Sequence, residues 1–452
     1  MSSPAKHQVA DPPASQTVFP DEILEEIFLR LDAAEDLARA STACTTFRHV
    51  VSARRFLHRF RCLHPPPVLG VLEFDAPGTF HPAEPPHRSA PAAQSADFTF
   101  SFLGTPHCWQ VCDARDGRVL LYRRVSVTAV FADLMVCDPF HRRHVQLPAI
   151  PDDLAAATGG WGMQEFDPFL NPNSDNAKPD FSFPVICAVQ CEHKLVSFHF
   201  SSVTGQWQGI TFNRTISLEP FFVRFQKMFE RHYAHGCFFW MINIVSSFLV
   251  MLNMHDMKLS VVDLPPGIHG IPRARAIVEA GEGMIGLFTL SDDGMLQLYY
   301  KSLRGTEWHH ERIIPLPKPN SYWSIDHTAA GYLLLKASQL DPSLFAMRES
   351  QYFTLNLKTF LVEELCVSWE PEWQHERIIP LPKPYSYWNN FGASAGYLLL
   401  KATPRDTSQF ATQYFYFTLN LKTFLVEELC VSHTRGALLY ASFLSSFSLP
   451  SI

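Results

Sequence analysis

The chain has 452 residues and a formal net charge of −7, from 37 Lys and Arg against 44 Asp and Glu. That length is sufficient for two or three domains with a substantial core. The acidic balance argues against a nucleic-acid-binding protein, because phosphate contacts need clustered Lys and Arg, and we expect no basic helix in the chain.

The first segment, residues 1–17, is polar and rich in Ala and Pro, and we interpret it as a disordered tail. It has no apolar stretch after a basic start, so no secretory signal is predicted. We therefore expect an intracellular protein, in the nucleus, the cytoplasm or both. The ten cysteines are then expected to be reduced packing residues rather than disulfides.

A small helical module is predicted over residues 18–62. The two acidic residues after Pro20 suit a helix N-terminus, where they offset the helix dipole. Apolar side chains then recur at the spacing of one helix face, and two further helices follow, through Leu37 and around Phe47. Three helices with so little apolar mass need a partner surface to complete their core. The apolar residues of this first helix are Ile23, Leu24, Ile27, Phe28 and Leu31.

This module resembles an F-box. The family's pattern begins Leu-Pro, continues with an acidic helix rich in Ile and Leu, passes a Leu-rich second helix and ends in a Cys-x-x-Trp-Arg-like stretch. Here Phe19 takes the place of the leading Leu, and Phe47 takes the place of the Trp; both replacements are large and apolar. The alternative is a generic helical bundle packed on the next domain. The matching segments are Phe19-Pro20-Asp21-Glu22-Ile23-Leu24, Asp36-Leu37 and Cys44-Thr45-Thr46-Phe47-Arg48.

The resemblance implies that the module docks on a Skp-type adaptor and, through it, on a cullin. The rest of the chain would then present an unknown protein target for ubiquitination, without catalysis by the chain itself. Alternatively, half of the implied side chains serve the module's own core, or the chain is a non-ligase scaffold with a degenerate F-box. The residues implied in adaptor binding are Phe19, Pro20, Ile23, Leu24, Ile27, Leu37 and Phe47.

A mainly antiparallel β domain is predicted over residues 98–452, after a Pro-rich connector with a possible strand at residues 63–97. Glycines precede comparable apolar runs at Gly236, Gly283 and Gly331, and intervals of 47 and 48 residues are typical of β-propeller blades. The predicted fold class is thus α+β, a three-helix F-box plus a propeller-like domain of unknown blade number. This part resembles the kelch-like, F-box-associated β domains of plant F-box proteins.

One part of the β domain occurs twice. Residues 307–368 recur, nearly unchanged, as residues 372–432. A unit that begins and ends at equivalent strands can be added without inverting the face pattern, because side chains alternate with a period of two. The second copy could therefore add one blade, pack outside the ring, or reflect a faulty gene model.

The uncharged stretch 237–254 is long enough to cross a membrane. We favour two buried strands joined at Ser246-Ser247, because Phe, Ile and Val dominate on both sides of this polar pair. No membrane association is therefore expected.

Three further patterns resemble a cofactor or metal site, and we expect none of them to bind one. Residues 281–286 match a dinucleotide fingerprint, but a strand rather than a helix is expected after them. His141 with His144, and His232 with His235, have no acidic or Cys partner that would complete a metal site, and we interpret them as surface or turn residues.

No motif identifies the target-binding residues. We expect residues 151–180 to form a long loop, and this loop is one candidate. Trp161, Trp323 and Trp388 are others, because aromatic side chains are enriched at binding hot spots. Burial in the core is an equally good expectation for each tryptophan.

Overall fold

A computed structural model of the chain separates into two compact units, residues 1–66 and 67–452. The model describes residues 19–31, 34–64, 66–73, 80–94, 100–104, 108–115, 117–123, 131–139, 141–159, 163–171, 183–191, 195–212, 231–240, 248–268, 274–291, 294–317, 321–329, 331–338, 340–341, 346–347, 351–365, 385–394, 396–404, 413–433 and 437–441.

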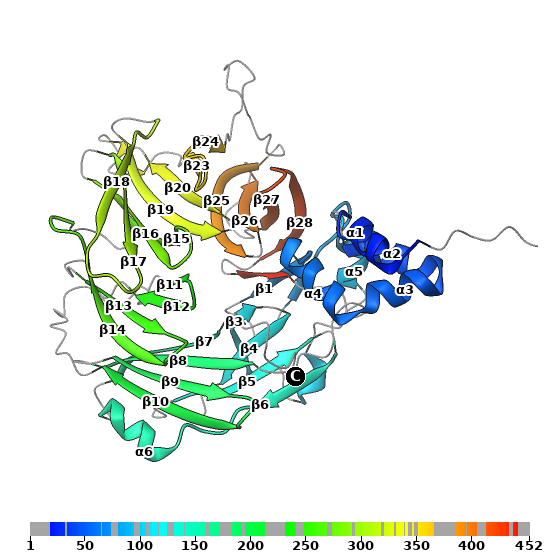
Figure 1. Cartoon of the computed structure of the whole chain (residues 1–452), viewed down its shortest axis with the longest axis horizontal. Helices are drawn as coiled ribbons and strands as arrows, with labels where there is room; N and C mark the ends of the chain where they lie inside the picture. Colours follow the sequence, from blue (N-terminus) through cyan, green and yellow to red (C-terminus); the bar gives the residue numbers. More distant parts are fainter. Residues whose placement is uncertain are drawn as a thin grey trace, which may run out of the picture. The chain divides into compact units, whose positions relative to one another are not determined.

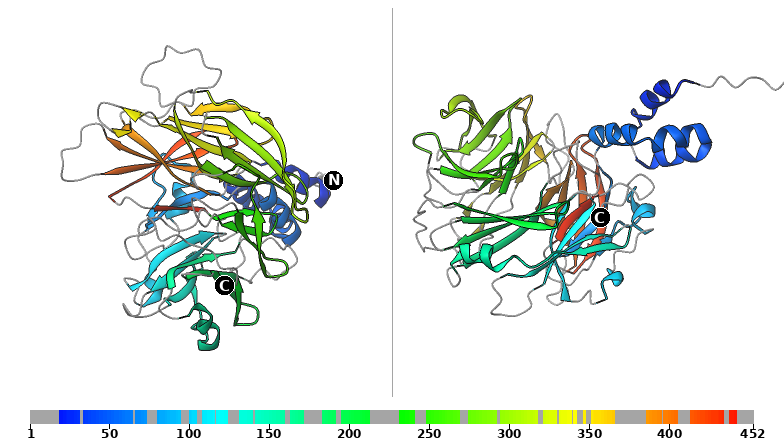
Figure 2. Two further views of the ribbon diagram at one scale, coloured as in Figure 1. Left: turned by 90° about the vertical axis from the view of Figure 1, so that its left-hand side faces the viewer. Right: turned by 60° about the horizontal axis from the view of Figure 1, so that its bottom comes forward.

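The first unit is helical (Figure 2, dark blue). Its helices are α1 (Asp21–Phe28), α2 (Ala34–Ala43), α3 (Thr45–Ser52) and α4 (Arg54–Leu63). The sequence predicted three helices, and α4 adds a fourth. Four of its ten residues are arginine, so the expectation that the chain has no basic helix was wrong.

The core of the first unit is largely aromatic. The ring of Phe28 packs edge-on against Phe47 and Phe56, with centroids 5.1 and 6.4 Å apart. Phe56 in turn stacks on Phe60 at 6.1 Å, so that α4 is held through two residues of one face. Helices α1, α3 and α4 thereby share a core that extends over about forty residues of sequence.

The second unit is a seven-bladed β-propeller (Figure 1). Each of blades 1 to 6 is a four-stranded antiparallel sheet. Blade 1 consists of β3 (Gln110–Arg115), β4 (Arg118–Arg123), β5 (Asp133–Asp138) and β6 (Arg143–Gln146). Blade 2 consists of β7 (Met163–Leu170), β8 (Pro184–Cys191), β9 (Leu195–Ser201) and β10 (Gln206–Phe212). Blade 3 consists of β11 (Arg231–Ala234), β12 (Cys237–Trp240), β13 (Phe248–Asn253) and β14 (Lys258–Asp263).

Blades 4 to 6 continue the same order along the chain. Their strands are β15 (Arg275–Glu279), β16 (Met284–Leu290), β17 (Leu296–Ser302) and β18 (His309–Ile314); β19 (Tyr322–Ala329), β20 (Tyr332–Ser338), β23 (Gln351–Asn356) and β24 (Val362–Leu365); and β25 (Tyr385–Ser394), β26 (Tyr397–Pro404), β27 (Tyr414–Asn420) and β28 (Val426–Ser432). The smaller elements are the β21 (Leu340–Asp341) and β22 (Ala346–Met347) hairpin, α5 (Ala90–Gln94), α6 (Asp152–Ala155) and the short 3-10 turns Ser101–Leu103 and Ala156–Thr158.

Blade 7 is built from both ends of the domain. Strand β29 (Ala437–Ala441) pairs with β1 (Val68–Glu73), which pairs with β2 (Phe80–Pro82). Strand β29 contacts β25 of blade 6 and β3 of blade 1, so this pairing closes the ring. The segment 63–97, expected as a connector with a possible strand, thus contains two strands of a blade and the helix α5.

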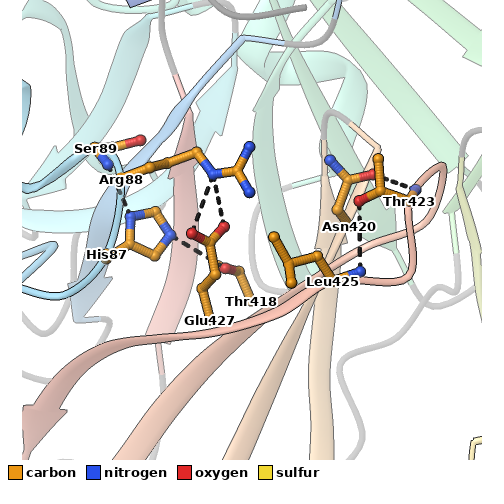
Figure 3. Close-up of polar contacts among 8 residues, drawn as sticks. All are labelled: His87, Arg88, Ser89, Thr418, Asn420, Thr423, Leu425 and Glu427. Carbon is orange, nitrogen blue, oxygen red and sulfur yellow. Dashed lines mark hydrogen bonds and ion pairs between the residues drawn. The ribbon is translucent and has the colours of Figure 1, made fainter. Parts of the chain in front are cut away.

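The chain after β2 continues across blade 6 (Figure 3). His87 Nε2 lies 3.2 Å from the Thr418 hydroxyl, and the Ser89 amide donates to His87 Nδ1 at 3.1 Å. Arg88 Nε donates to both carboxylate oxygens of Glu427, at 2.8 and 3.1 Å. These contacts of residues 87–89 with blade 6 form a second, polar link between the two ends of the domain. We call this group of contacts the seam.

The glycine spacing in the sequence corresponds to one recurring turn. Gly236, Gly283 and Gly331 each lie between the first two strands of a blade, with φ between 66° and 83°. Only glycine adopts this left-handed backbone without strain. Gly117 and Gly396 occupy the same place in blades 1 and 6. The predicted propeller-like fold class is confirmed, and its blade number is seven.

The expected loop at residues 151–180 was partly wrong, because β7 lies inside it as the first strand of blade 2. Pro168 and its acidic neighbour Asp167 disguised this strand, since both residue types are depleted in strands. Proline is tolerated here because β7 is an edge strand, paired on one side alone with β8.

Residues 237–254 contain two strands, β12 and β13, as predicted. They pair with each other, Cys237 opposite Asn253 and Trp240 opposite Val250. The proposed turn at Ser246-Ser247 lies outside the described residues. None of the helices that the structure describes has the length and apolar character of a membrane-spanning segment.

Candidate functional site: an apolar stripe on the helical unit

Helix α1 and the two residues before it present an apolar stripe to solvent. Phe19, Ile23 and Ile27 are 56%, 49% and 48% exposed. Ile23 and Ile27 are spaced four residues apart, so they lie on one face of the helix, and Phe19 lies just before the helix begins. Pro20 is exposed beside Phe19, and its carbonyl accepts the Ile23 and Leu24 amides at 3.0 and 3.2 Å, which begins the helix. Large apolar side chains on one exposed face are typical of a protein-binding surface.

Three of the seven implied residues face inward instead. Leu24 and Leu37 are 4% and 1% exposed and belong to the unit's own core. Phe47 is half-buried against Phe28. The structure therefore gathers Phe19, Pro20, Ile23 and Ile27 at the surface and separates them from the other three.

Helix α3 begins with a sulfur cap that the sequence analysis did not identify. Cys44 has an extended backbone, and its Sγ accepts the Phe47 amide at 3.4 Å. This contact fulfils the role that Ser or Asp usually has at a helix N-terminus. A Cys immediately before an apolar helical run was the available signal.

Arg59 joins α4 to the exposed side of α1. Its guanidinium donates to Glu25 Oε2 at 3.0 Å and to Glu26 Oε1 at 2.6 Å. The hydrogen bond from Arg59 lowers the pKa of Glu26, and the same bond raises the pKa of Arg59. The partners are more than thirty residues apart, so no local pattern predicts this pairing. It places a charged group directly beside the apolar stripe.

His64 fastens the end of α4 to the end of α1. Its Nε2 lies 2.8 Å from the Leu29 carbonyl oxygen, and its ring stacks on Phe60 with centroids 4.3 Å apart. The side chain is buried. Together with Arg59, it sets the direction of α1 relative to α4.

The candidate histidines have different surroundings from those expected. His141 Nδ1 lies 2.8 Å from Asp138 Oδ2, so the expectation that it lacks an acidic partner was wrong. His232 belongs to β11, and burial lowers its pKa to about 4. His235 Nε2 lies 2.9 Å from the Met284 carbonyl oxygen, and His144 packs near Phe102. Within the described ranges, no three His, Cys, Asp or Glu side chains converge as a metal site would require.

The fingerprint-like residues and Trp323 have structural roles. The fingerprint-like residues 281–286 form the turn before β16 and the start of that strand, as expected. Trp323 is buried against Phe353 at 4.9 Å. Trp388 lies in β25, and Trp161 lies outside the described residues.

A family model described as F-box-like matches residues 18–64, so the first unit is an F-box-like domain. No curated protein sequence matches the chain. Among similar solved structures, a prolyl endopeptidase is 10% identical with a TM-score of 0.35, over 92% of this chain and 55% of that one. An oligogalacturonate lyase in complex with manganese is 10% identical with a TM-score of 0.36, over 70% and 75%.

A third structure is the β-propeller domain of the Trilobed protease from Pyrococcus furiosus, 5% identical with a TM-score of 0.38, over 71% of this chain and 84% of that one. The chain spans about half the length of the prolyl endopeptidase. At these identities and TM-scores, the similarities carry no argument about function.

Proposed function

We propose that this chain is the substrate-recognition adaptor of a Skp-cullin-F-box ubiquitin ligase. Its F-box-like domain docks on a Skp-type adaptor and, through it, on a cullin, while the propeller binds a protein target. The observation that carries this proposal is the exposed stripe of that domain, Ile23 and Ile27 on α1 with Phe19 just before the helix.

The energetics favour such a contact. Fully burying an Ile or Phe side chain contributes about 1.5–3 kcal/mol, and each stripe residue already has roughly half of its surface buried. Three such side chains, with Pro20 beside them, are sufficient for a compact anchor of the kind that dominates protein interfaces. The remaining implied residues, Leu24, Leu37 and Phe47, act through the unit's own core.

In this proposal the chain has no catalytic role and works inside the cell, in the nucleus, the cytoplasm or both. It contacts no membrane and no nucleic acid. The propeller corresponds to the F-box-associated domains of plant F-box proteins, and the repeated blade arose by tandem duplication. The target remains to be identified by affinity capture on the propeller.

The test is co-purification of the full chain with a purified Skp-type adaptor. We expect Ile23→Asp to weaken binding about 100-fold or more, because a charge would be forced into an apolar contact. Val203→Asp is the matched control, since Val203 is 67% exposed in the β9–β10 turn of the propeller. Circular dichroism must show that all proteins are folded. A folded wild type that binds no adaptor would overturn the proposal in favour of a non-ligase scaffold.

A further inference from the structure

Charge is strongly segregated within the helical unit. Residues 44–64 contain five arginines and no Asp or Glu, in a chain whose net charge is −7. Residues 19–43 contain seven acidic residues and two arginines. One half of the unit is therefore basic and the other acidic, and such a distribution is a common basis for oriented binding.

The basic half meets the apolar stripe at Arg59. The Glu26 side chain, which Arg59 contacts, is 59% exposed. Glu26 is three residues after Ile23, so its side chain is a neighbour of this stripe residue on the helix surface. The side chain of Arg59, which is 36% exposed, thereby places its guanidinium at the rim of the stripe.

Arg55 is a second arginine on this face of α4. It precedes Arg59 by four residues, so the two side chains lie on the same face of the helix. Arg55 is exposed, and no ion pair forms on it within the described part of the chain. Arg59 has two carboxylate partners, whereas Arg55 has its full positive charge available. Arg59 thus lies beside the apolar stripe and Arg55 lies one turn away from Arg59 on α4, and we call these two arginines the basic row.

We propose that the basic row contacts an acidic segment of the same Skp-type adaptor that covers the apolar stripe. This inference rests on the proposed function and adds the chemistry of a second contact to it. Rim charges mainly steer association and set its salt dependence, while the apolar anchor sets the lifetime of the complex. The basic row therefore orients the adaptor, and the stripe retains it.

The experiment measures association rates of the full chain with the purified adaptor by stopped-flow fluorescence, at salt concentrations from about 50 to 300 mM. We expect Arg55→Glu to slow association about 3- to 10-fold at low salt, with little change in the dissociation rate. Glu26→Gln should accelerate association about two-fold, because it removes one carboxylate partner of Arg59. Both differences should decrease at high salt.

Arg39→Glu is the matched control. Arg39 is 80% exposed on α2 and pairs with Asp36 of the same helix, so the variant makes the same charge change away from α1 and α4. Equal rates for Arg55→Glu and Arg39→Glu, with wild-type binding intact, would overturn the basic row alone. Absence of binding by folded wild type would overturn the proposed function and this inference together. Salt-dependent retention of a labelled RNA duplex that Arg55→Glu abolishes, with adaptor rates unchanged, would also overturn it by assigning the row to nucleic acid.

Discussion

Blades 5 and 6 have nearly the same sequence and form the same turns. Asn356 Oδ1 accepts the Lys358 and Thr359 amides at 2.9 and 3.1 Å. Its counterpart Asn420 accepts the equivalent two amides at 2.8 and 3.0 Å, as Figure 3 shows in part. The phenylalanines that follow have φ of 58° and 56°. Local sequence alone is therefore sufficient to determine this turn in two different surroundings.

The same two blades differ where neighbouring structure matters. Thr354 and Thr418 are equivalent residues, and each lies opposite a glutamate of the last strand. Thr418 has a hydrogen-bond partner in His87 of the seam, whereas the buried Thr354 hydroxyl has none among the residues that the structure describes. Blade 6 faces the composite blade 7, and blade 5 faces blade 6. Whether a buried hydroxyl group has a hydrogen-bond partner thus depends on the next blade rather than on the repeated sequence.

The largest effect is expected in the shared apolar core, where the two blades should behave alike. Phe353 and Phe417 are equivalent and fully buried. We expect Phe353→Ala and Phe417→Ala each to lower the free energy of unfolding by about 3–5 kcal/mol, through lost burial and a cavity. Urea unfolding followed by tryptophan fluorescence measures both. A change below about 1 kcal/mol in either would contradict the equivalence of the two cores.

The threonine pair should separate the two blades by sign. Thr418→Val removes the partner of a buried histidine, and we expect a loss of about 1–2 kcal/mol. Thr354→Val removes a hydroxyl that has no partner in the described part of the chain, so we expect no loss or a small gain in stability. Thermal unfolding of both variants beside wild type gives the comparison. Equal losses would show that the seam does not distinguish the blades.

The seam should also respond to pH. Burial lowers the pKa of His87, so between its unfolded and its folded pKa the unfolded chain binds more protons. Stability from this residue is therefore present above the ordinary pKa of about 6.5 and is lost as pH falls toward the folded value.

His199 and His232, whose pKa values burial lowers to about 4, act in the same direction. The test is consequently the difference between wild type and His87→Gln. We expect the melting temperature of the variant to fall less steeply between about pH 6.5 and 5. A steeper fall in the variant would contradict a neutral, buried His87 at the seam.

The smallest effect is expected at the tips of the repeated turns. Leu361 and Leu425 are 56% and 45% exposed. We expect Leu361→Ser and Leu425→Ser each to change the free energy of unfolding by less than about 0.5 kcal/mol. Differential scanning calorimetry of the two variants checks this. A large loss at either position would mean that the turn packs on a neighbouring blade.

Local periodicity in the sequence predicted the parts of the fold that local residues control. The helical spacing of apolar residues predicted α1, and the spacing of Gly236, Gly283 and Gly331 predicted the turns of three blades. A second repeated signal escaped the sequence analysis. Asp138, Asn253, Asn356 and Asn420 each accept a turn amide, and the residue four positions later has positive φ. A residue with a side-chain oxygen, repeated at the ends of third strands, would have located these turns.

The features that the sequence did not reveal depend on distant partners. Blade 7 joins β1 to β29 across more than 350 residues, and no local pattern reports such a pairing. The same holds for the contacts of Arg59 with α1. Exposure was equally hidden, because Ile23 and Leu24 are adjacent, similar residues of which one faces solvent and the other the core. The sequence also left open whether the second copy of the repeated segment lies in the ring. In the structure both copies do, because the first contributes the four-stranded blade 5 and the second the four-stranded blade 6. Residues 372–384 of the second copy lie outside the described residues.

The central claim is that α1 is the surface through which this chain binds a Skp-type adaptor. Hydrogen exchange of the full chain, followed by mass spectrometry with and without purified adaptor, tests it most directly. We predict slower exchange in peptides covering residues 19–31 and in those covering α4, with the strands of the propeller unchanged. Slower exchange confined to propeller strands, with residues 19–31 unaffected, would contradict it.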